Sequence, residues 1–336
     1  MQKLLLIDGN SLFHRAYHAL PPLTDKKGEM ANAVFGFSNM IIKAIGEVKP
    51  THIACAFDTA APTFRHVEFE KYKAQRPAPP PDLYPQLPKV KRVLDAFGIA
   101  YFEMDGYEAD DVLATLATQV LRLKTKDKRL KQKKEFDVVI LSGDRDCLQL
   151  VDGNIKVQAP GWNLKETTLY GAKEVREKYG LETRQMVDYK SLIGDVSDNV
   201  PGIAGIGPKT AAQLLQKYHT LENLFKHIDE QPESIRAKLE AGKDIALAAK
   251  KLVELDRNVD LKFTFSKKND PIENLKFKPN WDQVRAEYED LGFKSIVSKL
   301  PGSKGSEGTN ETDETVSQSQ SVKSKTKRND NQLKLV

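Results

Sequence analysis

The stretch KLLLID at residues 3–8 decides the fold, because a short apolar run ends abruptly in an acidic residue. Two later stretches repeat the pattern: HIACAFD at residues 52–58 and DVVILSGD at residues 137–144. Short apolar runs of this length are typical of strands that are buried on both faces of a sheet. The three stretches therefore predict three strands of one buried sheet.

Helical patterns lie between these predicted strands. Apolar residues recur at helical spacing over 33–48, 90–97 and 110–123. Alternation of strands and helices predicts a doubly wound parallel sheet, covered by helices on both faces. From residue 171 to 300 the pattern is mostly helical, with one glycine-rich turn at 202–207. The fold class predicted is thus an α/β domain followed by a helical domain.

Composition sets limits on the class of protein. The chain has 336 residues and 40% hydrophobic residues, which is enough for two domains with real cores. No run approaches 18 apolar residues, and the N-terminal run is too short for a signal peptide, so we expect no membrane segment. Two cysteines far apart argue for a reducing compartment and against a disulfide framework or thiolate zinc site. We therefore expect a cytoplasmic protein.

Three segments differ in composition from the two domains. Residues 301–336 are polar and charged, and we expect a disordered tail there. Residues 62–92 are basic and rich in proline, and they mix cations with aromatics, as in segments that bind single strands. Residues 122–134 hold eight Lys or Arg and one Asp, which is typical of a solvated helix end or loop. The predicted domains are therefore 1–172 and 173–300.

Acidic residues follow all three predicted strands. Asp8, Asp58 and Asp144 stand where the strands end, and the carboxyl ends of parallel strands meet at one edge of a sheet. Six more acids are candidates for the same cluster: Glu108, Asp110, Asp111, Asp146, Asp195 and Asp198. Crowded carboxylates raise one another's pKa unless cations accompany them. Nine acids exceed the needs of one Mg²⁺ and favour two divalent ions, as in phosphodiester hydrolysis. A lone Asp after a strand is more often a helix cap or turn residue, and it is the set that favours a metal site.

Three of these acids lie at or just before the start of the helix predicted at 110–123. Glu108 and Asp111 are three residues apart and therefore share a helix face. Asp110 points elsewhere on an ideal helix, so we expect it to join the cluster only if the first turn frays.

The balance of charge outside this cluster is basic. The net charge of the whole chain is only +5, from 52 basic and 47 acidic residues. Without the tail and the nine acids, the chain holds 46 basic residues against 33 acidic ones. An acidic cleft in a basic protein suits a polyanionic substrate that is cleaved at a metal site.

The glycine-rich turn predicts a second kind of contact. The sequence GIAGIGPKTA at 202–211 precedes an apolar helical pattern. A Walker A loop is excluded because Pro208 separates glycine from lysine and no strand precedes the turn. A helix–hairpin–helix fits better, since its glycines let backbone N–H groups approach phosphates without reading bases. A plain helix–helix turn is the alternative.

Together these motifs resemble the bacterial 5′-nuclease family, which comprises the 5′→3′ exonuclease domain of DNA polymerase I and its flap endonuclease relatives. The resemblance spans residues 1 to about 300. The motifs that carry it are IDGN at 7–10, FHRAY at 13–17, FD at 57–58, TFR at 63–65, YKAQRP at 72–77, EADDV at 108–112, SGDRD at 142–146, QL at 149–150, GD at 194–195, SDNVPG at 197–202 and KTA at 209–211.

The resemblance implies a PIN-like α/β nuclease domain, a basic helical arch over residues 62–92, and a helical domain with the helix–hairpin–helix. It implies that all nine acids serve two Mg²⁺ or Mn²⁺ ions, and that Lys73 and Arg76 act on the scissile phosphate. Positions implied to contact DNA are Asn10, Arg15, Tyr72, Lys73, Arg76, Gly202, Gly205, Gly207, Lys209 and Thr210. A potassium ion at the hairpin is also implied.

The activity implied is metal-dependent 5′→3′ exonuclease and 5′-flap endonuclease cleavage of DNA, leaving 5′-phosphates. Its partners would be DNA with a 5′ single strand, RNA primer–DNA junctions and a separate DNA polymerase. The resemblance also implies a monomer that is associated with the bacterial nucleoid. The family's linker before the strand that carries Asp144 is usually shorter and less basic than 122–135 here. Polymerase motifs are missing, which leaves open a stand-alone nuclease or a truncated polymerase I. A PIN-type ribonuclease and a catalytically inactive, structure-specific DNA-binding module are the alternatives.

Overall fold

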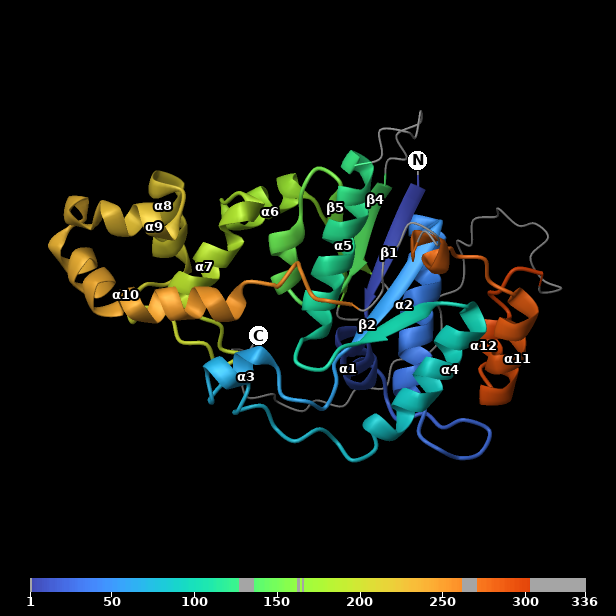
Figure 1. The fold of residues 1–336 in the computed structure, drawn as a ribbon. Coiled ribbons are helices and arrows are strands. Elements are labelled where there is room, and N and C mark those ends of the chain that lie inside the picture. Colours follow the sequence, from blue (N-terminus) through green and yellow to red (C-terminus); the bar gives the residue numbers. More distant parts are fainter. Residues whose placement is uncertain (1, 127–135, 162–163, 165, 262–270, 303–336) are drawn as a thin grey trace, which may run out of the picture.

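A computed structural model describes residues 2–126, 136–161, 164, 166–261 and 271–302 (Figure 1). Six strands form one sheet in the order β3-β2-β1-β4-β5-β6. Their bounds are β1 Gln2–Asp8, β2 His52–Phe57, β3 Ala100–Glu103, β4 Phe136–Leu141, β5 Ile155–Pro160 and β6 Thr167–Tyr170. All neighbours pair in parallel except β5 and β6. The chain moves outward from β1 in one direction and then from β4 in the other, so the sheet is doubly wound as predicted.

Helices cover both faces because side chains alternate along the strands. In β1, Leu5 and Ile7 face a core that includes helices α1, α2 and α4, whereas Leu4 and Leu6 face α5. The bounds of these helices are α1 Gly9–Ala19, α2 Asn32–Val48, α4 Leu87–Phe97 and α5 Ala109–Lys126. The helices predicted over 33–48, 90–97 and 110–123 are confirmed. The sequence patterns did not predict α1, β3, β5 or β6.

A second set of helices extends from the far edge of the sheet (Figure 1). These are α6 Ala172–Tyr179, α7 Met186–Ile193, α8 Pro208–Tyr218, α9 Leu221–Lys226 and α10 Glu233–Val253. Apolar side chains of α7, α8 and α10 belong to the same core cluster as α5 and one face of the sheet. The helical domain is therefore joined to the sheet by packing as well as by the chain.

The predicted helical domain does not include its last part, which is a correction. Helices α11, Trp281–Leu291, and α12, Lys294–Val297, pack against α2 and α4 of the sheet domain (Figure 1). Val284, Tyr288 and Ile296 fill this contact and are buried. Before α11, the backbone N–H of Phe277 donates to Thr51 O over 2.9 Å, beside β2. The chain thus returns to the first domain after α10.

Residues 64–86 form a strap between β2 and α4, and the strap is not the helical arch that was predicted. Within it only α3, Phe64–Glu68, and the short 3₁₀ turn Tyr84–Gln86 are helical. Prolines at 77, 79, 80 and 81 explain the difference, since proline removes an N–H donor and disfavours helix at the residue before it. Most of the basic run 122–134 and of the tail 301–336 lies outside the described residues.

A buried ion pair fixes the base of the strap. Arg65, 1% exposed, donates from Nη1 and Nη2 to the two carboxylate oxygens of Asp111 over 2.7 and 2.8 Å. Arg65 also donates from Nε to Leu252 O at 2.7 Å, from Nη2 to Glu254 O at 3.0 Å and from Nη1 to Glu108 Oε2 at 3.1 Å. One side chain thus joins the strap, α5 and the end of α10.

We expect Arg65→Met to lower the free energy of unfolding by about 3–5 kcal/mol, because it leaves the Asp111 carboxylate buried without its partner. Arg92→Met is the matched control. The side chain of Arg92 is 45% exposed and pairs with Glu287 and Asp290 at the surface, so about 1 kcal/mol or less is expected. Urea unfolding followed by circular dichroism measures both variants. Equal losses would show that Asp111 does not depend on Arg65.

Candidate active site

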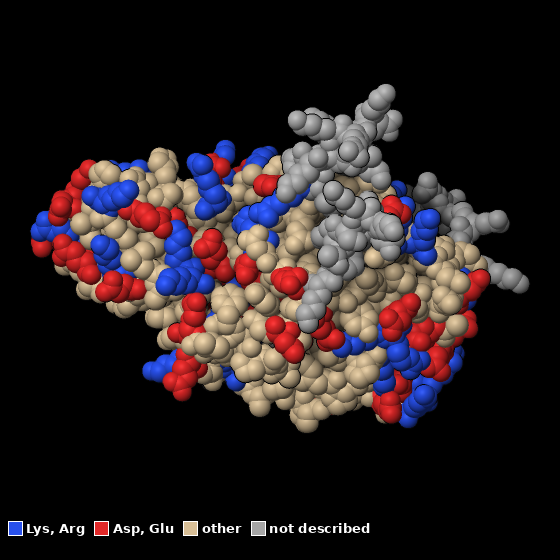
Figure 2. Space-filling view, in the orientation of Figure 1, with Lys and Arg blue, Asp and Glu red and all other residues tan. Residues whose placement is uncertain are grey.

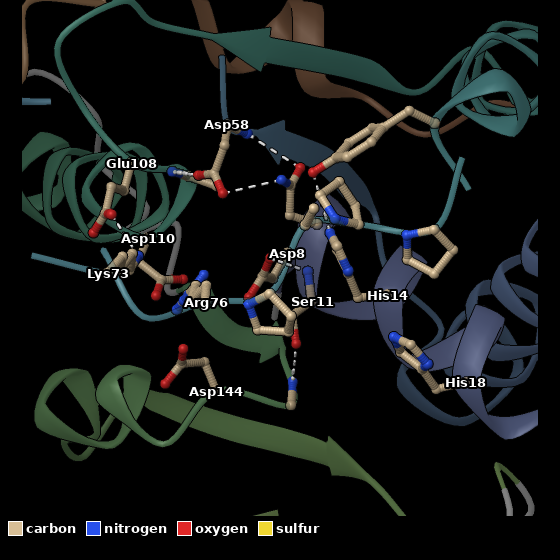
Figure 3. Close-up of a pocket in the computed structure, with 18 residues that line it drawn as sticks. Asp8, Ser11, His14, His18, Asp58, Lys73, Arg76, Glu108, Asp110 and Asp144 are labelled. Atoms are coloured by element: carbon tan, nitrogen blue, oxygen red, sulfur yellow. Dashed lines mark hydrogen bonds and ion pairs between the residues drawn. The ribbon is translucent and has the colours of Figure 1, made fainter. Parts of the chain in front are cut away.

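Five carboxylates line one cavity of about 690 Å³ at the carboxyl edge of the sheet (Figure 3). They belong to Asp8, Asp58, Glu108, Asp110 and Asp144. The cavity lies where the sheet changes its winding direction, between β1 and β4, which is where doubly wound folds bind ligands. The structure thus brings five of the nine predicted acids into one cavity.

Asp8 is the most enclosed of these carboxylates. It ends β1 and caps α1, accepting from the backbone N–H of Ser11 over 2.9 Å and from Ser142 Oγ over 2.6 Å. Ser142 follows β4, whose last residue pairs with Ile7. Burial, together with repulsion from Asp58 and Asp144, raises the pKa of Asp8 to about 7. The carboxylate is held rigidly in a place that disfavours its own charge.

Asp58 positions the start of α5. Its carboxylate accepts from the backbone N–H of Ala109 over 2.7 Å and from Asn10 Nδ2 over 3.0 Å. The end of β2 therefore fixes the helix turn that carries Glu108 and Asp110 into the cavity. Burial and repulsion from Asp8 and Asp144 raise the pKa of Asp110 well above its usual value.

Asp111, which the family resemblance predicts as a metal ligand, lies outside this cavity. Both of its oxygens accept from Arg65, and they also accept from the backbone N–H groups of Glu108, at 3.1 Å, and Asp256, at 2.8 Å. Successive helix residues point about 100° apart, so Asp110 enters the cavity while Asp111 turns into the core. Arg65 contacts both Glu108 and Asp111, which shows that these two side chains share a face, as expected.

The three remaining acids lie beside the cavity in ion pairs. Lys190 of α7 bridges Asp146 and Asp195, at 2.7 Å from Asp195. Burial opposes ionisation of Asp195, but Lys190 and hydrogen bonds from Ser197 lower its pKa to about 2. Asp198 accepts from Arg76 Nη2 over 2.7 Å.

The strap supplies two cations to these carboxylates. Lys73 Nζ lies 2.5 Å from Glu108 and 3.8 Å from Asp198, and Arg76 pairs with Asp198. Lys73 has φ +55°, a left-handed conformation that is uncommon outside glycine and often found at functional sites. Three cations, with Lys190, thus face eight carboxylates.

The donor chemistry of this cluster fits divalent cations. All of its candidate ligands are carboxylate oxygens, which Mg²⁺ and Mn²⁺ prefer, and their negative charge exceeds that of the three cations. In the described part of the chain, however, no three His, Cys, Asp or Glu side chains are arranged to share an ion. Lys73, Arg76 and Lys190 occupy several of the oxygens instead.

Several residues of the cavity were missed by the sequence reasoning. They are Ser11, His14, His18, Tyr84 and the strap residues Pro77, Ala78, Pro79 and Pro80. His14 and His18 carried a signal, since their spacing of four places them on one face of a helix that follows an acid-ended strand. Tyr84 carried none, because its position depends on the path of an irregular segment.

Only some of the residues predicted to contact a 5′ strand line the cavity. Asn10, Lys73 and Arg76 line the cavity. Tyr72 does not, because it is 3% exposed, packs against Leu252 and Ala249, and has its hydroxyl 2.9 Å from Asp198. The ring is a packing element in this structure, and its contact with a 5′ strand stays a prediction. Arg15 is half-buried, and its Nε donates to Gly161 O over 3.3 Å.

The predicted helix–hairpin–helix is formed by α7, the turn at 194–207 and α8. A Cβ on Gly202 would lie 2.2 Å from the Ile193 carbonyl carbon, so the turn closes only with glycine there, and Gly205 has φ +77°. Gly207 caps α8, and Gly207 and Lys209 are exposed with Thr210 partly so. Backbone N–H groups at the start of α8 therefore face solvent beside a lysine.

Surface charge is mixed on the face drawn in Figure 2, where basic and acidic side chains are interspersed over both parts of the molecule. The basic excess expected from composition does not form one continuous field on that face. The described residues contain no helix that is both long and apolar enough to cross a bilayer.

Comparison with known sequences assigns the family. The model of the 5′-3′ exonuclease N-terminal resolvase-like domain matches residues 3–180, and that of the 5′-3′ exonuclease C-terminal SAM fold matches residues 181–275. The chain belongs to the 5′-3′ exonuclease family, whose members are hydrolases. The fold class and the family expected from the motifs are confirmed.

Similar proteins include DNA polymerase I of Caldicellulosiruptor bescii, 41% identical over 303 residues, which are 89% of this chain and 33% of the relative. DNA polymerase I of Bacillus subtilis is 39% identical over 300 residues, which are 89% of this chain and 32% of the relative. The chain thus spans about a third of the length of these relatives.

Solved structures share the fold. The T5 5′-exonuclease with bound divalent zinc has a TM-score of 0.58 at 19% identity, covering 88% of this chain and all of that chain. The catalytic core of Rad2 in complex with DNA substrate has a TM-score of 0.54 at 18% identity, covering 88% of this chain and 91% of that one.

The raised pKa of Asp8 predicts a pH-dependent stability of the metal-free protein. The pKa is 3.8 unfolded and about 7 folded, so the folded state binds more protons and loses stability as the pH rises between these values. The loss is about 1.4 kcal/mol per pH unit. Asp8→Asn still caps α1 but does not titrate. We therefore expect its free energy of unfolding, relative to that of wild type, to increase from pH 4 to pH 7, as measured by urea unfolding in EDTA.

Asp195→Asn is the control for this titration. The pKa of Asp195, about 2 in the folded protein, lies below this window. The difference between that variant and wild type should therefore stay constant from pH 5 to 7. A constant difference for Asp8→Asn as well would contradict the assigned pKa.

Proposed function

We propose that this chain hydrolyses phosphodiester bonds of DNA near 5′ single-stranded ends and flaps, leaving 5′-phosphates. The observation that carries the proposal is the cavity at the edge of the sheet, in which five carboxylates face two cations of the strap. Carboxylates recruit divalent ions, and cations attract phosphates, so one cavity offers both parts of a phosphodiester site. Family membership supports the same activity.

Two Mg²⁺ or Mn²⁺ ions would be held by Asp8, Asp58, Glu108, Asp110 and Asp144, with Asp146, Asp195 and Asp198 on the side of the helical domain. Such ions supply a water of lowered pKa and stabilise the oxygen that leaves. The T5 5′-exonuclease has been solved with divalent ions bound. In this structure Lys73, Arg76 and Lys190 neutralise part of the carboxylate charge. These ion pairs would be released when the divalent ions bind.

Lys73 and Arg76 would then bind the scissile phosphate. Both lie on the strap at the border of the cavity, within reach of the carboxylates that they now pair with. A guanidinium and an ammonium in this position would orient the phosphate and stabilise the charge that develops on it. Asn10, held by Asp58, lines the same cavity.

The hairpin would hold the duplex part of the substrate. Its exposed glycines and Lys209 present N–H groups and a cation to a phosphate backbone, which gives binding without sequence preference. A potassium ion bound by the turn is part of this proposal. The relatives named DNA polymerase I suggest the setting, in which flaps and RNA primers are removed beside a DNA polymerase.

Cleavage of a 5′-flap DNA labelled at both ends tests this function. We expect cleavage near the junction in Mg²⁺ and none in EDTA. Asp144→Asn should reduce the rate by about 100-fold or more, since it removes a carboxylate from the cavity. Asp229→Asn, an exposed acid of the helical domain, should leave the rate unchanged.

Other outcomes separate the alternatives. Tight flap binding with no cleavage in Mg²⁺ would replace the enzyme by a structure-specific binding module. Faster cleavage of a matched single-stranded RNA than of the flap would favour a ribonuclease. Release of only short 5′ products would make the enzyme chiefly an exonuclease.

The hairpin is tested by the salt dependence of binding. Lys209→Ala should weaken duplex binding for all sequences alike and reduce the slope of log K against log salt by about one, as expected for the loss of one phosphate contact. Fluorescence anisotropy in EDTA measures it. Lys217→Ala is the control, since Lys217 pairs with Glu230 at the far end of α8. The same slope of log K against log salt in both variants would show that Lys209 does not contact the DNA backbone.

A further inference from the structure

Tyr84 stands at the meeting point of two cavities. It lines the carboxylate cavity and also a neighbouring cavity of about 1160 Å³, and the lining residues common to both are Asn10, Asp58 and Tyr84. Asn10 and Asp58 are hydrogen-bonded to each other. Tyr84 is 44% exposed although it is a large aromatic residue. Core packing therefore does not account for the position of its ring.

Neighbouring rings support Tyr84. His14 of α1 meets it edge to face, with ring centroids 5.8 Å apart at 79°, and His14 Nε2 lies 3.3 Å from the Tyr84 hydroxyl. The buried ring of Phe13 lies 6.2 Å away. Burial lowers the pKa of His14, so a neutral imidazole is favoured beside the phenol. The ring is thus held in place while much of it stays open to solvent.

The carboxylate cavity has two chemically different walls. Glu108, Asp110 and Asp144 lie on the acidic side, and Figure 3 shows His14 and His18 across the cavity from Glu108 and Asp110. Asp58 lines both cavities together with Tyr84. Tyr84 and the prolines of the strap lie among the other lining residues. A nucleotide has the same division, with an anionic phosphate at one end and a flat apolar base at the other.

We propose that Tyr84, braced by His14 and Phe13, is a stacking platform for a nucleobase of the substrate strand beside the scissile phosphate. The inference rests on the proposed function and adds a binding residue to it. An aromatic face stacks on any base, so the platform would fix the strand without reading its sequence. Its position shared by two cavities would place the stacked base where the strand passes from one to the other.

A scan with abasic nucleotides tests the platform. Flap substrates carry one abasic residue at successive positions on both sides of the cleavage site. At one or two positions the wild-type kcat/KM should fall about 5- to 150-fold, the range that loss of one base–aromatic stack corresponds to. Tyr84→Ala should lose a similar factor on the intact flap and lose nothing more when that base is absent.

Further variants exclude a merely structural effect. Tyr84→Phe keeps the ring and should retain the abasic dependence, whereas Tyr84→Leu keeps apolar bulk and should lose it. Leu169→Ala on β6 removes another apolar side chain of similar exposure, 47%, and should show the wild-type scan. A 2-aminopurine at the sensitive position, measured in EDTA, should be quenched on binding to wild type and not to Tyr84→Ala.

The outcomes separate this inference from the proposed function. A scan in which all positions behave alike, or in which Tyr84→Ala loses as much as wild type at the sensitive base, overturns the platform while cleavage stands. Absence of cleavage by wild type in Mg²⁺ overturns the proposed function. In that case 2-aminopurine placed at each position of the scan in turn decides the platform: quenching at one position that depends on Tyr84 supports it, and its absence at all positions refutes it.

Discussion

Mutual repulsion among carboxylates at one edge of the sheet is the constraint on which the rest of the structure depends. Parallel strands end at the same edge, so Asp8, at the end of β1, and Asp58, just after β2, must lie close together, and α5 adds Glu108 and Asp110. Burial, and after it repulsion between these like charges, raises the pKa of Asp8 and Asp110. Cations from other segments form ion pairs with the carboxylates of the cluster: Lys73 and Arg76 from the strap and Lys190 from α7. Electrostatics thus joins three segments that are distant in sequence.

A second ion pair determines where those cations stand. Arg65 and Asp111 are buried together, and their backbone partners come from the end of α10 and the segment after it. The strap leaves this anchor, packs Tyr72 against α10 and reaches Asp198 through a backbone bond from Lys73 N, 2.9 Å long. Asp110 and Asp111 therefore serve different purposes although they are neighbours: one faces the cavity, and the other holds the segment that covers it.

Local sequence predicted what depends on local periodicity. The strands around 3–8, 52–58 and 137–144 and the acids that end them followed from apolar runs and the geometry of parallel sheets. The side chosen by Asp111 did not follow, because it depends on Arg65, 46 residues away. The burial of Tyr72 depends on α10, and the docking of α11 depends on α4, and both contacts join segments that are still farther apart in the sequence. The prolines of the strap disfavour a helix, and the helical arch expected there from the family resemblance did not take this local effect into account.

The position of Tyr84 follows from the same strap. Anchored at Arg65 and bound to the helical domain through Lys73 and Arg76, the chain crosses the cavity at its prolines and reaches Tyr84 just before α4 begins. The cations that face the carboxylates and the ring that faces His14 therefore lie on one continuous segment with both ends fixed. Proline restricts φ along the crossing, so the segment between the cations and the ring has few backbone conformations. The groups suited to a phosphate and the group suited to a base are consequently held in register by the covalent chain itself.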